Sequence, residues 1–123
     1  MDRYLVVMAG AALGGLARFM AGTAIMERYG GPFPLGTVAI NVSGSFLIGL
    51  LMALLTEHNA HPNWRLFLVV GVLGGYTTFS SFEWETLRAM KTSGPVIALA
   101  NVVGSVVLGY LAVWIGASIG TRP

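Results

Sequence analysis

The segment from Gly71 to Phe82 carries the residue types most able to do chemistry in this chain of 123 residues. It sets two adjacent glycines beside four hydroxyl side chains: Gly74 and Gly75, then Thr77, Thr78, Ser80 and Ser81. Glycine weakens a helix by roughly 1 kcal/mol, and Ser and Thr compete for its backbone hydrogen bonds. The segment predicts a helix broken near Gly75, of the kind that marks ion sites in membranes. The alternative is a kinked, dry helix whose hydroxyls bond back to its own carbonyls.

Two aromatic residues, Phe79 and Phe82, flank Ser80 and Ser81 in the same segment. Their ordinary role is packing. A phenyl ring also has a positive edge, however, which attracts a small anion without the full charge that would trap it. With hydroxyl donors beside the rings, the pattern favours an anion route.

Two polar stripes have the spacing i, i+4, i+8, so each lies on one helical face: Asn41, Ser45 and Gly49 in the first, and Asn101, Ser105 and Gly109 in the second. Such stripes either line a conduction path or pack helices through hydrogen bonds and small residues. The second stripe repeats the first at an offset of 60, with six identities in eleven positions from residue 41. Leu13-Gly14-Gly15 recurs as Leu73-Gly74-Gly75 at the same offset. An ancestral repeat and convergence on close packing both explain this.

Arg18 is the one full charge well inside an apolar stretch, which makes it a candidate functional residue. Eight residues, about 12 Å of helix, separate it from Met26, so it either snorkels to the interface or faces a water-filled vestibule that concentrates anions. The glutamates at 27, 57, 83 and 85 fall at the ends of the apolar stretches, which leaves no acid at membrane depth for proton transfer. The chain shows no metal-ligand cluster and no nucleophile with its base, so we expect no enzymatic activity.

The composition predicts an all-α membrane protein. The chain is 55% hydrophobic and only 10% charged, whereas a soluble domain has about 25% charged residues. Four stretches have the length of a transmembrane helix, within a single domain of residues 1–123: about 4–26, 35–56, 65–82 and 95–119. An amphipathic stretch, residues 83–94, is a candidate extension of the third. The net charge of +2 has no cluster, so nucleic acid is not an expected partner.

Lys and Arg are balanced across the membrane, which predicts dual topology: Arg3, Arg65 and Arg122 lie on one side, and Arg28, Arg88 and Lys91 on the other. So few charges also balance readily by chance. Four helices of this length cannot surround a pore and cover it with protein, so conduction needs association of copies.

The motifs together resemble the small bacterial fluoride channels of the CrcB/Fluc family. They run through the first three spans in register: Gly14-Gly15-x-x-Arg18, Gly36-Thr37, Asn41-x-x-Gly44-Ser45-Phe46 and Gly74-Gly75-x-Thr77-Thr78-Phe79-Ser80-x-Phe82. The resemblance implies an antiparallel homodimer in the bacterial inner membrane, embedded in lipid. It also implies passive, fluoride-selective export that lowers cytoplasmic fluoride, with no organic cofactor.

The resemblance also implies roles for particular residues. Phe79 and Phe82 would turn their ring edges toward fluoride, and Asn41, Ser80, Ser81 and Ser105 would supply donors. Arg18 would stand in the vestibule, and backbone carbonyls at Gly74 and Thr77 would hold a structural Na⁺ at the dimer interface. Ser81 stands where threonine is common in the family, which keeps the hydroxyl.

Two other functions fit a chain of this size. A small dual-topology multidrug/proton exporter would need a membrane-embedded glutamate. A non-conducting assembly subunit would use the polar stripes for packing alone.

Overall fold

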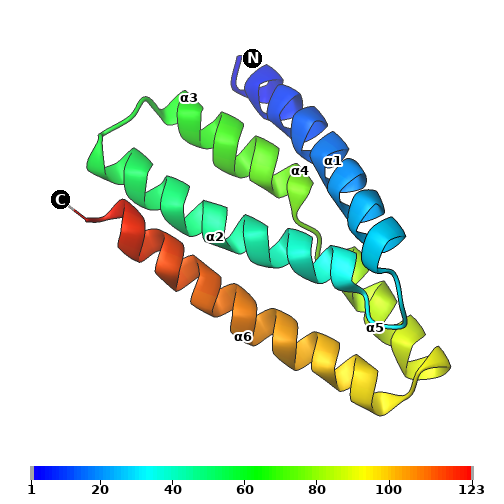
Figure 1. Ribbon diagram of the computed structural model, residues 1–123. Helices are drawn as coiled ribbons and strands as arrows, with labels where there is room; N and C mark the ends of the chain where they lie inside the picture. The colour runs from blue at the N-terminus through cyan, green and yellow to red at the C-terminus, as the bar shows by residue number, and fades with distance from the viewer. Residues whose placement is uncertain (1, 123) are drawn as a thin grey trace.

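The computed structural model describes residues 2–122, and within them the chain is helical with four segments long and apolar enough to cross a membrane. This confirms the predicted all-α class with four spanning helices. Three of the four are single helices: α1 (Asp2–Tyr29), α2 (Leu35–Glu57) and α6 (Pro95–Gly120). The third spanning segment, Pro62–Thr92, is built from several pieces (Figure 1).

The third spanning segment begins with a short α-helix, passes into a π-helix and then breaks. Its pieces are α3 (Pro62–Arg65), η1 (Leu66–Leu73), α4 (Gly74–Tyr76) and α5 (Ser80–Thr92). The amphipathic stretch that follows Phe82 is therefore helical down to Thr92. Gly94, with φ of +94°, turns the chain after α5, and Pro95 occupies the first turn of α6, where its missing N–H is no loss.

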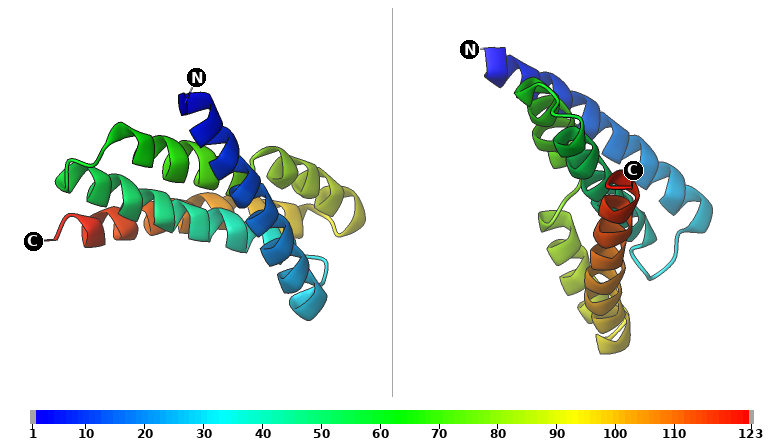
Figure 2. Two further views of the ribbon diagram at one scale, coloured as in Figure 1. Left: turned by 90° about the horizontal axis from the view of Figure 1, so that it is seen from above. Right: turned by 90° about the vertical axis from the view of Figure 1, so that its left-hand side faces the viewer.

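The helices associate in two pairs, α2 with α6 and α1 with η1 and α4 (Figure 1). Glycines allow the close approach in both pairs. A Cβ on Gly116 would meet the carbonyl oxygen of Phe46 and lie 2.9 Å from the backbone nitrogen of Leu50, inside any real Cβ contact. In the other views α1 lies obliquely across the remaining helices (Figure 2).

The two Leu-Gly-Gly motifs lie against each other in the α1 pair. A Cβ on Gly14 would strike the carbonyl oxygen of Val72, and one on Gly75 would lie 2.6 Å from that of Ala11 and 3.1 Å from the nitrogen of Gly15. The Leu-Gly-Gly part of the sequence repeat thus has a packing role, because the glycines of each copy let the backbone of the other copy come close.

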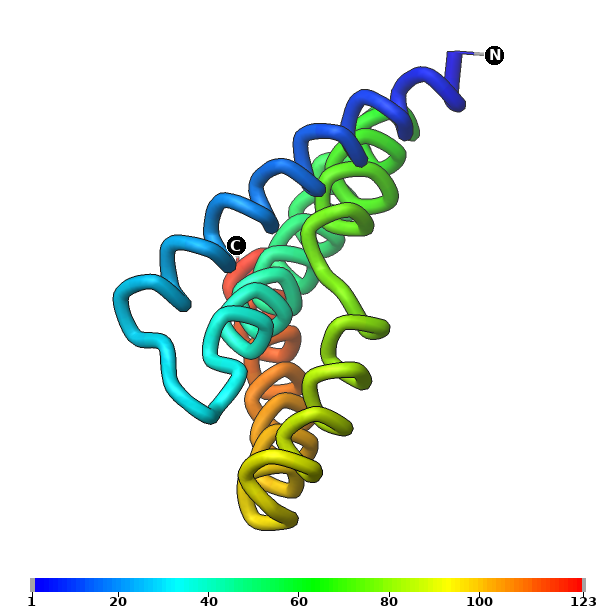
Figure 3. Tube along the Cα trace, turned by 90° about the vertical axis from the view of Figure 1, so that its right-hand side faces the viewer, coloured from blue at the N-terminus to red at the C-terminus, as the bar shows by residue number. Residues whose placement is uncertain are grey.

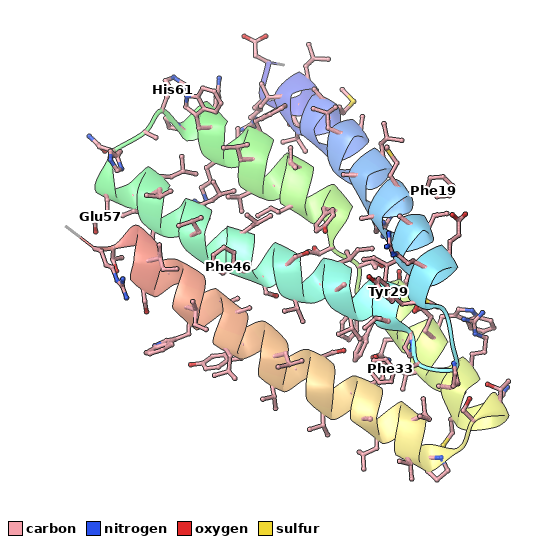
Figure 4. All side chains as sticks on the ribbon, viewed as in Figure 1. Phe19, Tyr29, Phe33, Phe46, Glu57 and His61 are labelled. Carbon is pink, nitrogen blue, oxygen red and sulfur yellow. The ribbon has the colours of Figure 1, made fainter. Side chains whose placement is uncertain are left out.

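Large apolar side chains cover the outside of the molecule. Phe19 on α1 is 69% exposed and points away from the other helices (Figure 4), and Tyr110 and Trp114 on α6 are 72% and 62% exposed. An exposed apolar surface of this extent is a contact surface for lipid or for another protein. It agrees with a chain that crosses the membrane several times.

Candidate functional site

The third spanning segment breaks at residues 77–79, between α4 and α5, where the trace runs straight from one helical piece to the next (Figure 3). Thr77 is extended, with φ of −84° and ψ of 157°, and it stands at the midpoint of Pro62–Thr92. Its N–H and its hydroxyl both donate to the carbonyl oxygen of Leu73, at 2.9 Å each, which closes α4. The predicted mid-span break is therefore present, a few residues beyond Gly75.

Asn41 on α2 supplies the hydrogen bonds that the break requires. Its Nδ2 donates to the carbonyl oxygen of Thr78 at 2.8 Å, and its Oδ1 accepts the N–H of Thr78 at 2.9 Å. Unsatisfied backbone groups are costly at membrane depth, so a broken helix persists only where such partners exist. Asn41 thus holds the break open from a neighbouring helix.

The two carbonyls predicted to hold sodium lose their helical donors at this break. In a continuous α-helix, Gly74 would accept from the N–H of Thr78, and Thr77 would accept from the N–H of Ser81. Instead, Thr78 donates to Asn41, and Ser81 donates to the hydroxyl of Thr78 at 3.2 Å. The carbonyl oxygens of Gly74 and Thr77 are thereby released for another partner.

Phe79 and Phe82 lie together but in different surroundings. Their ring centroids are 5.9 Å apart and the ring planes are inclined by 49°. Phe82 is only 7% exposed, whereas Phe79 is 74% exposed and projects from the chain. A pore that used both rings would need a wall beyond Phe79 that this chain alone does not supply.

Two cavities meet at the break. A cleft of about 610 Å³ is lined by residues that include Arg18, Thr37, Thr78, Ser81 and Glu85. A second cavity of about 350 Å³ is lined by Asn41, Ser45, Gly74, Thr77, Thr78 and Phe79, among others. Thr78 belongs to both linings, so the residue that Asn41 fixes stands between the two cavities.

The cavities sort the predicted site residues into groups. Arg18 and Ser81 share the larger cleft, and Asn41, Gly74, Thr77 and Phe79 share the smaller one. Ser80 is exposed and Ser105 half-buried, and neither lines these two cavities. The hydroxyl of Ser105 instead donates to Asn101 Oδ1 at 3.4 Å.

Glu85 is a site residue that the sequence interpretation placed elsewhere. It was expected at the end of a span, but α5 carries it along the wall of the larger cleft, half-buried, where it accepts the hydroxyl of Thr37 at 2.8 Å. The spacing from Ser81 to Glu85 is i, i+4 on α5, and that signal could have placed both on one face.

The described part of the chain, residues 2–122, has no group of three or more His, Asp and Glu side chains close enough to hold a metal ion. In the same residues, every buried side-chain nitrogen and oxygen has a hydrogen-bond partner.

Known proteins resemble this chain over nearly its whole length. Residues 5–117 match the protein family described as "CrcB-like protein, Camphor Resistance (CrcB)". A protein of Solibacter usitatus named "Fluoride-specific ion channel FluC" is 60% identical over 98% of this chain and 99% of its own length. Proteins of the same name from Acidobacterium capsulatum and Thermus thermophilus are 50% and 43% identical, each over 98% of this chain and 97% and 96% of their own lengths. The exporter hypothesis finds no support among these relatives. The chain belongs to the CrcB-like family.

Proposed function

We propose that this chain is a fluoride-selective ion channel that exports fluoride passively and so lowers its concentration in the cytoplasm. The observation that carries the proposal is the 60% identity, over 98% of the chain, to a protein named as a fluoride-specific channel. The broken span with its two cavities gives that identity a physical basis. The chain is a multi-pass membrane protein of the bacterial inner membrane and not an enzyme.

Two copies inserted in opposite directions form the channel, each contributing its residues 1–123 as one four-helix domain. The exposure of Phe79 supports this arrangement, because a 74% exposed ring beside a break needs a second surface to close a path around it. The carbonyl of Gly74 and the hydroxyl of Ser80 also lie on exposed residues at this surface. The balance of three Lys and Arg residues on each side allows both insertions.

Fluoride enters through the larger cleft, where the guanidinium of Arg18 attracts anions and offsets the carboxylate of Glu85 in the same lining. It then passes the donors of Ser81, Ser80 and Asn41 and the edges of Phe79 and Phe82. Ser105 on α6 becomes a further donor when its hydroxyl turns from Asn101 Oδ1 to the ion. Nδ2 of Asn41 has two N–H groups, and Thr78 uses one, so the other stays available to the ion. Several neutral donors replace the hydration of a small anion without binding it too tightly to leave.

A structural Na⁺ at the dimer interface would rest on the carbonyls of Gly74 and Thr77. The donor set fits a hard cation, which prefers oxygen ligands, because the break redirects the N–H groups that would otherwise cover both carbonyls. Bound there, the ion would supply positive charge between the broken spans of the two copies and so hold these spans together. The residues of this chain set the carbonyl directions, and Asn41 fixes them through Thr78.

Fluoride accumulation in cells tests the function. In a bacterium without fluoride exporters of its own, expression of this chain is expected to lower cytoplasmic fluoride and to restore growth in fluoride-containing medium. A chain that carries Phe79→Ile is the matched control, because it keeps the helices and removes a ring. Equal fluoride accumulation with and without the wild-type chain would contradict the proposal.

Labelling of single cysteines tests the antiparallel arrangement. The chain has no cysteine of its own, so Asp2→Cys and Thr121→Cys each give one reactive site. A membrane-impermeant thiol reagent applied to intact cells is expected to label about half of either variant, since equal populations have their ends on each side. Complete labelling, or none, would contradict dual topology.

A further inference from the structure

Asn101 is the most deeply buried polar side chain of the described residues, with 1% of its surface exposed. Its Nδ2 donates to the hydroxyl of Thr86 on α5 at 2.8 Å. That hydroxyl donates to the carbonyl oxygen of Phe82 at 2.7 Å. On the other side of the amide, Oδ1 accepts the hydroxyl of Ser105 at 3.4 Å. A continuous chain of hydrogen bonds therefore joins α6 to the backbone of Phe82.

The directions of these bonds make the chain specific. A threonine hydroxyl has a single hydrogen, and here it is given to the carbonyl of Phe82, so the same oxygen accepts from Asn101. A hydroxyl that bonds back to the i−4 carbonyl is common in helices. Thr92 makes the same bond to Arg88 on the same helix, at an exposed position and at 2.8 Å. Thr86 differs because its hydroxyl oxygen also accepts a hydrogen bond from Asn101 on a second helix, α6.

The two repeat-related asparagines bond the third spanning segment at two places. Asn41 fixes Thr78 within the break, and Asn101 fixes Thr86 on α5. Phe79 and Phe82 lie in the chain between these two fixed residues. Because residues 77–79 are not helical, α5 is not held in line with α4, and its position depends on contacts with other helices such as α6.

We propose that Thr86 and Asn101 are positioning residues that hold Phe82 beside Phe79 by fixing the middle of α5 to α6. The inference rests on the proposed fluoride conduction. Without the pair, α5 could shift about the break, and the Phe82 ring would lose its fixed place next to Phe79. Neither residue has to touch the ion for this effect.

Fluoride efflux from liposomes, normalised to the amount of folded protein, tests the proposal with Thr86→Val. The substitution keeps the shape and removes the hydroxyl that joins Asn101 to Phe82. Flux is expected to fall about tenfold, the size associated with loss of a buried hydrogen bond. Thr86→Ser, which restores a hydroxyl, should recover most of the flux. Ser118→Ala on α6 is the matched control, since it removes the same type of back-bond, from Ser118 to the carbonyl oxygen of Trp114, at a residue that lines neither cavity, and its flux should stay unchanged.

Asn101→Leu should lower flux to a similar extent, and its combination with Thr86→Val should lower it no further than the stronger single change. Thr86→Ala is the second variant should Thr86→Val elute as unfolded protein. Unchanged flux in a folded Thr86 variant, beside a conducting wild type, would overturn this inference alone. Absence of flux from the wild type would overturn the proposed function and this inference with it. Failure of Thr86→Ser to recover flux would also contradict a positioning role for the hydroxyl.

Discussion

Asn41 meets Thr78 with both ends of its amide, as donor to the carbonyl oxygen at 2.8 Å and as acceptor from the N–H at 2.9 Å. One side chain on α2 thereby completes the backbone hydrogen bonding of a residue in the middle of the third span. The break is held by this contact as much as by the glycines beside it.

Replacement of Asn41 by leucine, which has the same branching and the same number of side-chain heavy atoms, leaves both polar groups of Thr78 without a partner. Each unsatisfied buried group costs about 1–3 kcal/mol, so the melting temperature in detergent should fall by several degrees. Asn63→Leu, on exposed α3, is the control and should melt close to the wild type. Equal melting of all three proteins would show that the Asn41 contact does not support the break.

Replacement by alanine should change the stability of the protein very differently at two adjacent glycines of α1. A Cβ on Gly14 runs into the carbonyl oxygen of Val72, while one on Gly15 meets no atom within 4 Å. Overpacking of this kind costs about 1–3 kcal/mol. Thermal unfolding should therefore show Gly14→Ala strongly destabilised and Gly15→Ala little changed. The reverse order would mean that α1 and η1 do not pack as described.

Phe79→Ile should cut fluoride flux about tenfold or more while leaving the protein assembled, because the ring edge is lost and the 74% exposed side chain supports little of the chain's own core. Flux and size-exclusion elution are measured on the same preparation. Phe46→Ile on α2 is the control, as a phenylalanine that lines neither cavity at the break. An unchanged rate in Phe79→Ile would remove the ring-edge role.

The dependence of fluoride flux on salt concentration tests the role of Arg18. Arg18→Gln should reduce fluoride flux most at about 10 mM salt, where the Debye length is about 30 Å, and little at about 1 M, where it is about 3 Å. The salt used consists of ions that do not pass through the channel. Arg28→Gln is the control, because Arg28 lies over the ring of Tyr29 at the end of α1 and does not line the cleft. A reduction that is independent of salt would exclude electrostatic attraction of anions by Arg18.

Apolar stretches between charged and Pro-rich segments predict four spanning helices, and the Gly-Gly pair followed by hydroxyl residues indicates that the third one breaks. Both are local properties of the chain, so they can be predicted from one sequence. The partnership of Asn41 with Thr78 is tertiary: it depends on how α2 crosses the third span, and no spacing along the chain encodes it. The π-helix over Leu66–Leu73 has no polar residue to reveal its register.

Glu85 shows where a composition argument misled. The sequence places both Glu83 and Glu85 at the end of the third span, yet α5 carries Glu85 into the lining of the cleft and leaves Glu83 exposed. The exposure of Phe79 was equally beyond sequence reasoning, because the surface it faces is proposed to come from a second copy. Its contacts are not a property of one chain.

The most direct test of fluoride conduction is ion efflux from liposomes that contain the purified protein, followed with fluoride-selective and chloride-selective electrodes. We expect rapid fluoride efflux and at least about a hundredfold slower chloride efflux, which corresponds to a difference of about 2.7 kcal/mol. Fluoride efflux no faster than from protein-free liposomes, or chloride efflux at an equal rate, would contradict it.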